Sequence, residues 1–181
     1  MDVLEAMRSA RAWRSYTDRE VTDDDVKFLI DYARRAGSGH NRQPWTFVAL
    51  RDRERIDTLA SFGSYTTPLT RAPLGLVLLL DENESERRTE HNVFDCGRAA
   101  QNLQLAATER GLGICPQGIS EREAAAEFLD IPEGKRVLMA FAVGYPTEED
   151  ADEIEGVSKE DELHMMGREG VSEILHWERH G

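Results

Sequence analysis

Three short apolar segments set the framework of this chain. They lie at Trp45–Leu50, Leu74–Leu80 and Val137–Val143, and polar or turn residues bound each of them. Continuous apolar runs of this length are typical of strands covered on both faces, whereas a strand with one wet face alternates apolar and polar side chains. The segments therefore predict a small sheet with helices on both sides.

The segments around these strands carry helical patterns. Three pairs of residues have the spacing of a helix capping box: Asp2 with Glu5, Thr22 with Asp25, and Ser120 with Glu123. Helices are expected after Asp2, after Thr22, and over Asp52–Phe62, Asn92–Arg110 and Ala124–Leu129. Because this order does not alternate as repeated βα units, the expected fold class is a three-layer α+β domain with a small mixed sheet.

The length and composition predict one domain over residues 1–181. The chain is 40% hydrophobic, enough for one sizeable core, and no shift in composition argues for a second domain. Within it we expect an acidic connector at 147–162 and a C-terminal arm at 169–181. No segment has the length and apolarity of a membrane span, and the N-terminus does not resemble a signal peptide, so a cytoplasmic protein is expected. Its two cysteines, Cys96 and Cys115, are expected to be reduced packing residues.

The net charge of -13 argues against a nucleic-acid partner, because phosphate backbones are held by clustered lysine and arginine. Arginine greatly outnumbers lysine, which occurs only at Lys27, Lys135 and Lys159, while acids crowd into 148–153 and 160–162. Two interpretations stay open. The acids form an ordinary solvated surface, or they mark a halophilic source, where salt at about 1 M shortens the Debye length to roughly 3 Å and screens their repulsion.

The polar loop Ser38–Trp45 is the strongest functional signal. Asn41 and Gln43 each offer a donor and an acceptor, Gly39 frees the backbone to turn, and Pro44 is expected to hold Gln43 in an extended conformation. Side-chain amides beside a strand suit a flat heterocycle whose rim alternates donors and acceptors. The alternative is a loop that caps a helix and hydrogen-bonds to itself.

Six segments resemble motifs of the nitroreductase family of flavin mononucleotide (FMN) enzymes, in that family's order along nearly the whole chain. The Ser38 loop resembles the signature S-x-x-N-x-Q-P-W. The other five are Arg11–Tyr16 (R-S-x-R-x-Y), Asp95–Leu103 (D-x-G-x-A-x-x-N-L), Gly111–Gly118 (a G-L-G strand and flavin-facing turn), Gly144–Pro146, and Arg168 before the C-terminal arm. Each motif is weak singly, but six in this order are hard to reach by chance.

The resemblance implies a small, mixed, mostly antiparallel sheet and a homodimer, with FMN where the two chains meet. For the FMN phosphate the resemblance implies Arg11, Arg14, Arg168 and, more weakly, Arg35. For the flavin ring it implies two sets of residues, one on each side: His40, Asn41 and Gln43, and Pro116, Gln117 and Gly118. A backbone N–H of the turn, or the Gln117 amide, would lie near N5 and O4 of the ring. His40 has a competing role as a loop cap.

The chain departs from the family pattern at the phosphate motif. Ala10 and Ala12 stand where the family commonly has an arginine and a serine, and Met166 replaces a basic residue near Arg168. Each hydrogen bond to a charged group is worth roughly 1.5 to 3 kcal/mol, and roughly 1.4 kcal/mol is a tenfold change in affinity. Losing two such bonds would weaken FMN binding by about a hundredfold unless other groups compensate.

The resemblance therefore implies an FMN-dependent oxidoreductase that takes hydride from NAD(P)H and passes it, by a ping-pong reaction, to a small acceptor: a nitroaromatic, a quinone, a flavin or an enone. No side chain is expected to act as an obligatory acid or base. The alternative is a non-catalytic dimer that binds flavin or another nucleotide through a degenerate phosphate site; a specialised flavin reaction is a third possibility. No metal site is expected, because His176 and His180 have no third ligand nearby.

Overall fold

The computed structural model of the chain describes residues 1–82, 85–147 and 169–180. The chain divides into two units, 1–147 and 148–181, and each is described by itself. The elements are α1 (Val3–Ser9), α2 (Asp23–Ala33), the 3-10 helix η1 (Gly39–Asn41), β1 (Trp45–Leu50), α3 (Arg53–Ser61), α4 (Thr67–Arg71), β2 (Leu74–Asp81), α5 (Glu86–Glu109), β3 (Gly113–Gln117), α6 (Arg122–Phe128) and β4 (Lys135–Gly144) in the first unit, and α9 (Val171–Ile174) in the second.

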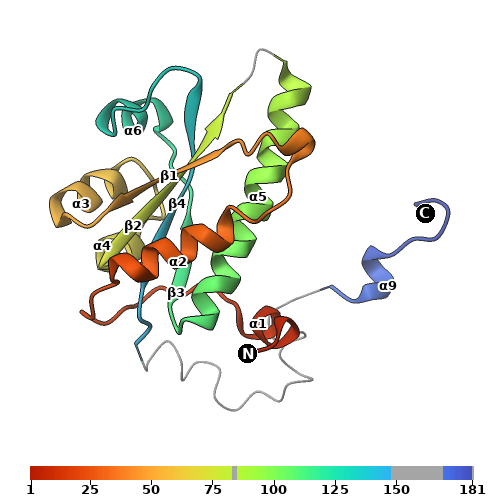
Figure 1. Cartoon of the computed structure of the whole chain (residues 1–181), viewed down its shortest axis with the longest axis horizontal. Coiled ribbons are helices and arrows are strands. Elements are labelled where there is room, and N and C mark those ends of the chain that lie inside the picture. Colours follow the sequence, from red (N-terminus) through yellow and green to blue (C-terminus); the bar gives the residue numbers. More distant parts are fainter. Residues whose placement is uncertain (83–84, 148–168, 181) are drawn as a thin grey trace. The chain divides into compact units, whose positions relative to one another are not determined.

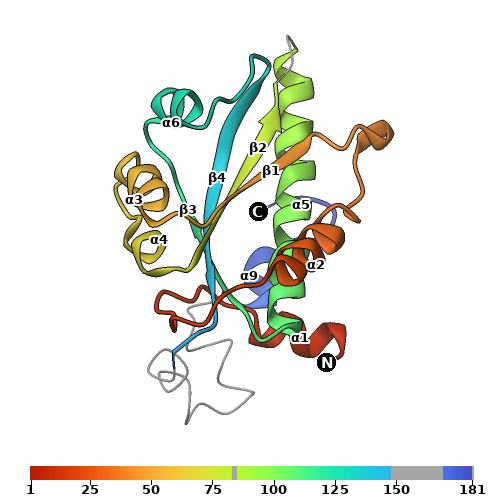
Figure 2. The same ribbon diagram turned by 60° about the vertical axis from the view of Figure 1, so that its left-hand side comes forward.

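The sheet of the first unit has its four strands in the order β1-β2-β4-β3, and each neighbouring pair is antiparallel. The parallel component is one isolated bridge between Ala12 and Ile114. Helices α3, α4 and α6 lie on one side of the sheet and α2 and α5 on the other (Figures 1 and 2). The three-layer α+β architecture expected from the sequence is thus confirmed.

Strand β2 supplies both hydrophobic cores, because its side chains alternate between the two faces of the sheet. Leu76, Leu78 and Leu80 belong to the core shared with α2 and α5, while Val77 and Leu79 belong to the core shared with α3, α4 and α6. All five are at most 2% exposed. This double burial explains why the strand is uniformly apolar in sequence.

The strand boundaries follow the apolar runs closely, and β1 has the expected bounds. The long helix differs: α5 begins at Glu86, ahead of the expected start at Asn92. Its first turns are polar and carry no apolar periodicity, so the sequence pattern missed them. The short helix α4 was not expected either.

Of the three capping-box predictions, the one at Thr22 is confirmed, the one at Asp2 is confirmed for the side-chain cap alone, and the third is wrong. Asp2 accepts a hydrogen bond from Glu5 N at 2.8 Å, and Thr22 forms a complete capping box with Asp25. The box expected at Ser120 is wrong, because α6 begins after Glu121 and has no side-chain cap. The backbone N–H of Ser120 instead donates to Phe62 O at 2.9 Å.

The prediction of one domain over 1–181 is not settled by this division and stays a prediction. Within the expected acidic connector, residues 148–162 lie outside the described part of the chain, and so does Arg168. No helix among the described residues is long and apolar enough to cross a membrane.

The carboxylate of Asp25 joins three elements at one corner of the first unit. Its Oδ2 accepts hydrogen bonds from Thr22 Oγ1 at 2.8 Å and from Tyr145 Oη at 3.2 Å, and its Oδ1 lies 3.7 Å from Arg110 Nη1. Burial alone would raise the pKa of Asp25, but the hydrogen bonds from Thr22 and Tyr145 and the charge of Arg110 outweigh it and lower that pKa. The ionised carboxylate therefore stabilises the folded state.

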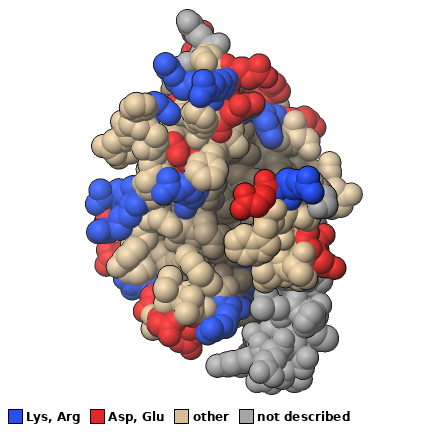
Figure 3. Space-filling model, turned by 90° about the vertical axis from the view of Figure 1, so that its right-hand side faces the viewer, with Lys and Arg blue, Asp and Glu red and all other residues tan. Residues whose placement is uncertain are grey.

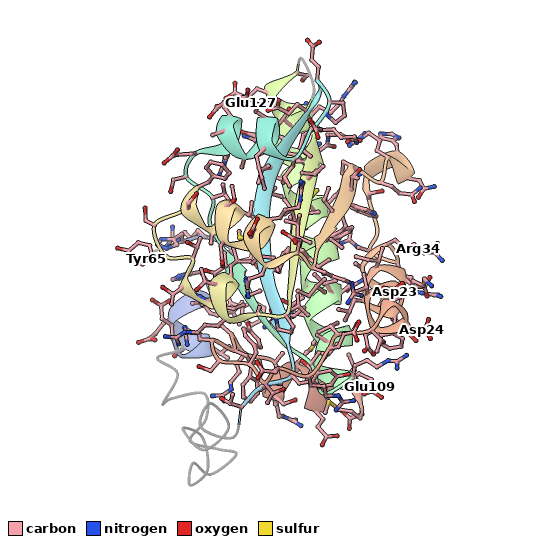
Figure 4. The ribbon with its side chains drawn as sticks, turned by 90° about the vertical axis from the view of Figure 1, so that its left-hand side faces the viewer. Asp23, Asp24, Arg34, Tyr65, Glu109 and Glu127 are labelled. Atoms are coloured by element: carbon pink, nitrogen blue, oxygen red, sulfur yellow. The ribbon has the colours of Figure 1, made fainter. Side chains whose placement is uncertain are left out.

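We expect Asp25→Asn to lower the free energy of unfolding by about 1–3 kcal/mol at pH 7. Because the pKa of Asp25 is lowered by folding, its contribution is present above the unfolded value of about 3.9 and is lost as the pH falls through the folded value. The gap between wild type and variant, measured by urea denaturation, should shrink below about pH 4. Asp24→Asn is the control, since Asp24 points outward from α2 (Figure 4). A gap that stays constant with pH would contradict this account.

Candidate functional site

The loop from Ser38 to Pro44 is folded by its own hydrogen bonds. Ser38 Oγ accepts from Gln43 N at 3.0 Å, and Ser38 O accepts from Asn41 N at 3.0 Å. His40, Asn41 and Gln43 have φ angles of 53°, 56° and 52°. A positive φ is uncommon outside glycine, and such backbone strain clusters at functional sites. The side chains of His40, Asn41 and Gln43, expected on one side of the ring, are exposed.

The expectation that Pro44 holds Gln43 in an extended conformation is wrong. The φ of Gln43 is 52°, in the left-handed region. Proline disfavours the right-handed helical conformation for the residue before it, and two local hydrogen bonds select the left-handed alternative here. Besides the bond to Ser38, Gln43 Nε2 donates to Asn41 O at 3.3 Å.

Helix α5 anchors this loop through a buried carboxylate. Asp95 Oδ2 accepts a hydrogen bond from Gly39 N at 2.8 Å, and Asp95 is only 4% exposed. The next residue, Cys96, places its Sγ 3.6 Å from Pro44 O. Asp95 stands in the sequence motif Asp95–Leu103, but no role was expected for it. The signal that would have identified it is an acid on the buried face of a helix.

The predicted phosphate segment lies beside the start of β3. Trp13 N donates to Ile114 O at 3.1 Å, and Ala12 forms the parallel bridge to the same residue. Gln104 of α5 donates from Nε2 to Arg11 O at 3.1 Å. The Arg11 guanidinium stacks 3.7 Å from the centroid of the Trp13 ring, which fixes its direction. Arg14 is exposed.

The predicted ring-facing turn lies at the other end of the same strand. Pro116 and Gly118 are exposed, and a Cβ added at Gly118 would meet no atom within 4 Å. The Gln117 side chain is buried instead: its Nε2 donates to Pro116 O and to Cys115 Sγ, each at 3.0 Å. Of the two donors considered for the ring, the backbone of this turn is therefore the accessible one.

The structure brings some of the predicted site residues together within one chain and separates others. Arg11 and Ala12 lie beside the first residues of β3, and the predicted ring-facing turn lies at the end of the same strand. The Ser38 loop is held at Asp95, nine residues before Gln104 on α5, which corresponds to roughly 13–14 Å along the helix. Arg35 is engaged within its own helix, where its Nη2 lies 2.7 Å from Asp31 Oδ2.

Two pockets open beside the turn. One, of about 330 Å³, is a mostly apolar groove between α5 and the sheet, lined by residues that include Leu78, Cys96, Gly97, Pro116, Met139 and Phe141. The other, of about 480 Å³, is lined by Tyr65, Gly118 and Arg122 among others. Tyr65 is 91% exposed and projects outward (Figure 4). The sequence analysis did not single out Tyr65, and a lone aromatic residue in a polar loop gave no signal.

Both cysteines are buried, as expected for packing residues. Cys96 and Cys115 are both free and buried, and burial raises the pKa of Cys96 to about 12. The thiol of Cys96 therefore stays protonated at neutral pH. His176 and His180 have ring centroids 4.2 Å apart, but the described residues contain no group of three or more side chains that could hold a metal.

The chain is similar to several known proteins. The model of the nitroreductase family matches residues 7–63 and 63–145. A provisionally named NADH dehydrogenase/NAD(P)H nitroreductase of Archaeoglobus fulgidus is 32% identical over 152 residues, which cover 82% of this chain and 87% of that protein. The FMN reductase (NADPH) of Bacillus subtilis is 25% identical over 80% of this chain and 66% of its own.

Among solved structures, a provisionally named NADH oxidase of Clostridium acetobutylicum superimposes with a TM-score of 0.73. It is 32% identical, and the match covers 78% of this chain and 87% of the other.

We expect Asp95→Ala to free the Ser38 loop, because Gly39 N loses the carboxylate that accepts its hydrogen bond while the helix stays intact. Hydrogen exchange at Gly39–Asn41 should become faster, and the free energy of unfolding should fall by about 1–3 kcal/mol. Glu90→Ala, on the exposed side of the same helix, is the matched control. Unchanged exchange in the loop would show that Asp95 does not anchor it.

Proposed function

The chain belongs to the nitroreductase family, and from this premise we propose that it is an FMN-dependent oxidoreductase that uses NADH or NADPH to reduce a small organic acceptor. The observation that carries the proposal is the match over residues 7–145, together with the exposed turn and the arginine segment at the two ends of β3. Bound FMN supplies the ring that accepts hydride; the chain binds and orients it.

Arg11 and Arg14 hold the FMN phosphate in this proposal, because planar guanidinium groups bind phosphate oxygens in pairs. Arg168, the third arginine that the resemblance implies, lies outside the described residues. The Trp13 stack and the Gln104 hydrogen bond keep the Arg11 segment in place. Arg35 contributes less, since Asp31 holds its guanidinium.

The ring lies between the exposed turn and the Ser38 loop. At Gly118 no Cβ obstructs the backbone, so its N–H can come close to the ring and stabilise charge that develops there. The apolar groove beside Pro116 suits a flat ring and excludes water. His40, Asn41 and Gln43 supply the polar contacts of the opposite edge. No side chain of this chain acts as an obligatory acid or base.

A homodimer completes the site. Within one chain the Ser38 loop and the Arg11 segment are anchored to α5 at points roughly 13–14 Å apart, so a cofactor between two copies can take one from each. The outer face of α5 is suited to such a contact: Val93 and Phe94 are 38% and 69% exposed, and Gly97 has open space around it.

The acceptor is a nitroaromatic, a quinone, a free flavin or an enone, and it uses the same pocket in turn with the nicotinamide nucleotide. A cytoplasmic location and adaptation to high salt belong to the proposal as well.

Anaerobic mixing of the FMN-loaded protein with NADH or NADPH tests the proposal that the protein is an oxidoreductase. The flavin absorbance should bleach and then recover on adding menadione or nitrobenzene; a flavin that neither nucleotide reduces would refute the oxidoreductase.

A second candidate is a non-catalytic dimer that binds flavin weakly. Ala10 and Ala12 remove two groups that the family pattern places near the phosphate, and the Asp31 pair limits what Arg35 can replace. Titration with FMN separates the two candidates. The enzyme should bind FMN at micromolar concentrations or tighter in its preferred salt, whereas the alternative predicts much weaker binding.

We expect Arg14→Ala to weaken FMN binding by about tenfold or more, because a charge-assisted bond to the phosphate is lost. Riboflavin, which lacks the phosphate, should bind equally to wild type and variant. Fluorescence titration with both ligands measures this difference, and Arg71→Ala, an exposed arginine at the end of α4, is the control. Equal losses for both flavins would place Arg14 outside the phosphate site.

We expect Phe94→Asp to dissociate the homodimer, because it puts a charge on the apolar face of α5. Light scattering coupled to gel filtration should give the mass of one chain for the variant and of two for wild type. Thr70→Asp, at an exposed position of α4, should leave the dimer intact. A wild-type monomer would refute the shared site directly.

A further inference from the structure

A basic pocket lies where the Ser38 loop meets the start of α5. It has a volume of about 280 Å³, and its lining combines three arginines, two histidines and a serine: His40, Arg42, Ser85, Arg87, Arg88 and His91. On α5, His91 follows Arg87 and Arg88 by four and three residues, so its side chain neighbours each of theirs along the helix. Figure 3 shows blue side chains near the upper end of the surface, the end at which α5 begins in Figure 1, with red side chains beside them.

The positive charge of this pocket is not neutralised by ion pairs. Across residues 1–82, 85–147 and 169–180, no carboxylate forms an ion pair with Arg42, Arg87 or Arg88. The buried Nε of Arg42 has no hydrogen-bond partner either. In a chain with 35 acidic and 22 basic residues, arginines should find acidic partners easily. Three unpaired guanidinium groups around one pocket therefore point to an anion from outside the chain.

The backbone adds to this field. Ser85 is the N-cap of α5, a helix of 24 residues, and within the described part of the chain no side chain makes a capping hydrogen bond at that end. The N-terminus of a helix carries partial positive charge and attracts anions. Glu86 and Glu90, the nearest acids along the helix, form no ion pair with the arginines of the pocket.

We propose that this pocket binds a phosphate monoester, and that the phosphate is the 2′-phosphate of NADPH. Pockets that enclose a whole drug-sized ligand measure about 300–1,000 Å³, so a pocket of about 280 Å³ suits one anionic group of a larger molecule. Paired guanidinium groups match the oxygens of a phosphate dianion.

The choice of NADPH rests on the proposed function. NADPH and NADH differ only by the 2′-phosphate, and His40 belongs both to this pocket and to the loop that contacts the ring. A nucleotide whose nicotinamide lies on that ring has its adenosine end nearby. The pocket therefore selects NADPH over NADH and leaves the flavin phosphate to the Arg11 segment.

The test compares the binding of 2′,5′-ADP with that of 5′-AMP, which lacks only the 2′-phosphate. Titration calorimetry should show that wild type binds 2′,5′-ADP about tenfold or more tightly than 5′-AMP, and that Arg87→Gln/Arg88→Gln abolishes this preference. Arg71→Gln, with an exposed arginine outside the pocket, should keep the preference. Equal binding of the two nucleotides by wild type, or an unchanged preference in the double variant, would overturn the 2′-phosphate site.

Kinetics separate this proposal from the proposed function. The ratio of kcat/KM for NADPH to that for NADH should fall by about tenfold in the double variant, through KM rather than kcat. If both nucleotides reduce wild type but the ratio does not change in the variant, the phosphate site alone is refuted. If neither reduces wild type, the oxidoreductase is refuted, and the titration still decides whether the pocket binds the 2′-phosphate.

Discussion

The double burial of β2 is the constraint on which the rest of the first unit depends. Its side chains enter two separate cores, so a slip of one residue in its pairing with β1 or β4 would exchange the contents of both. Because both cores are closed by helices, the register of this one strand also fixes where α5 lies against the sheet. The residues of the candidate site are held by α5, through hydrogen bonds to Gly39 and Arg11, and by β3, through its bridge to Ala12.

Helix α5 positions the site through polar contacts rather than apolar ones. Asp95 holds Gly39 at one level of the helix, and Gln104 holds Arg11 at another. A rigid helix keeps these two anchor points roughly 13–14 Å apart. In the proposed homodimer each copy of the chain would therefore present both halves of a site, and two sites would form together.

Much of the fold was predictable because it depends on local patterns. Apolar runs located β1 and β2, and the Thr22 capping box located α2, since these features are set by neighbours in sequence. The errors lie where tertiary contacts decide. Gln43 takes a positive φ because its backbone N–H donates a hydrogen bond to Ser38 Oγ. Ser120 does not cap α6, and its backbone N–H donates to Phe62 O.

For the candidate site, the sequence predicted residue types rather than contacts, and its role in binding stays a prediction. The residue types of the loop and of the Arg11 segment could be read from the motifs, but the partners that hold them could not. Asp95 and Gln104 are ordinary residues of a helical pattern until the fold brings the loop and the N-terminal segment to them. The direction of the Gln117 side chain likewise depends on packing, because only the folded strand shows that Cys115 and Pro116 take its donors.

The charge distribution decides how a chain of net charge -13 can bind anionic nucleotides at all. At physiological ionic strength the Debye length is about 8 Å, so the distant acidic surface is largely screened and the charges within one pocket dominate. The arginines of the first unit are therefore more informative than the net charge. Those held by acids, such as Arg34 and Arg35 with Asp31, are satisfied within the fold. Those without acidic partners, Arg42, Arg87 and Arg88, concentrate positive potential where an incoming phosphate can use it.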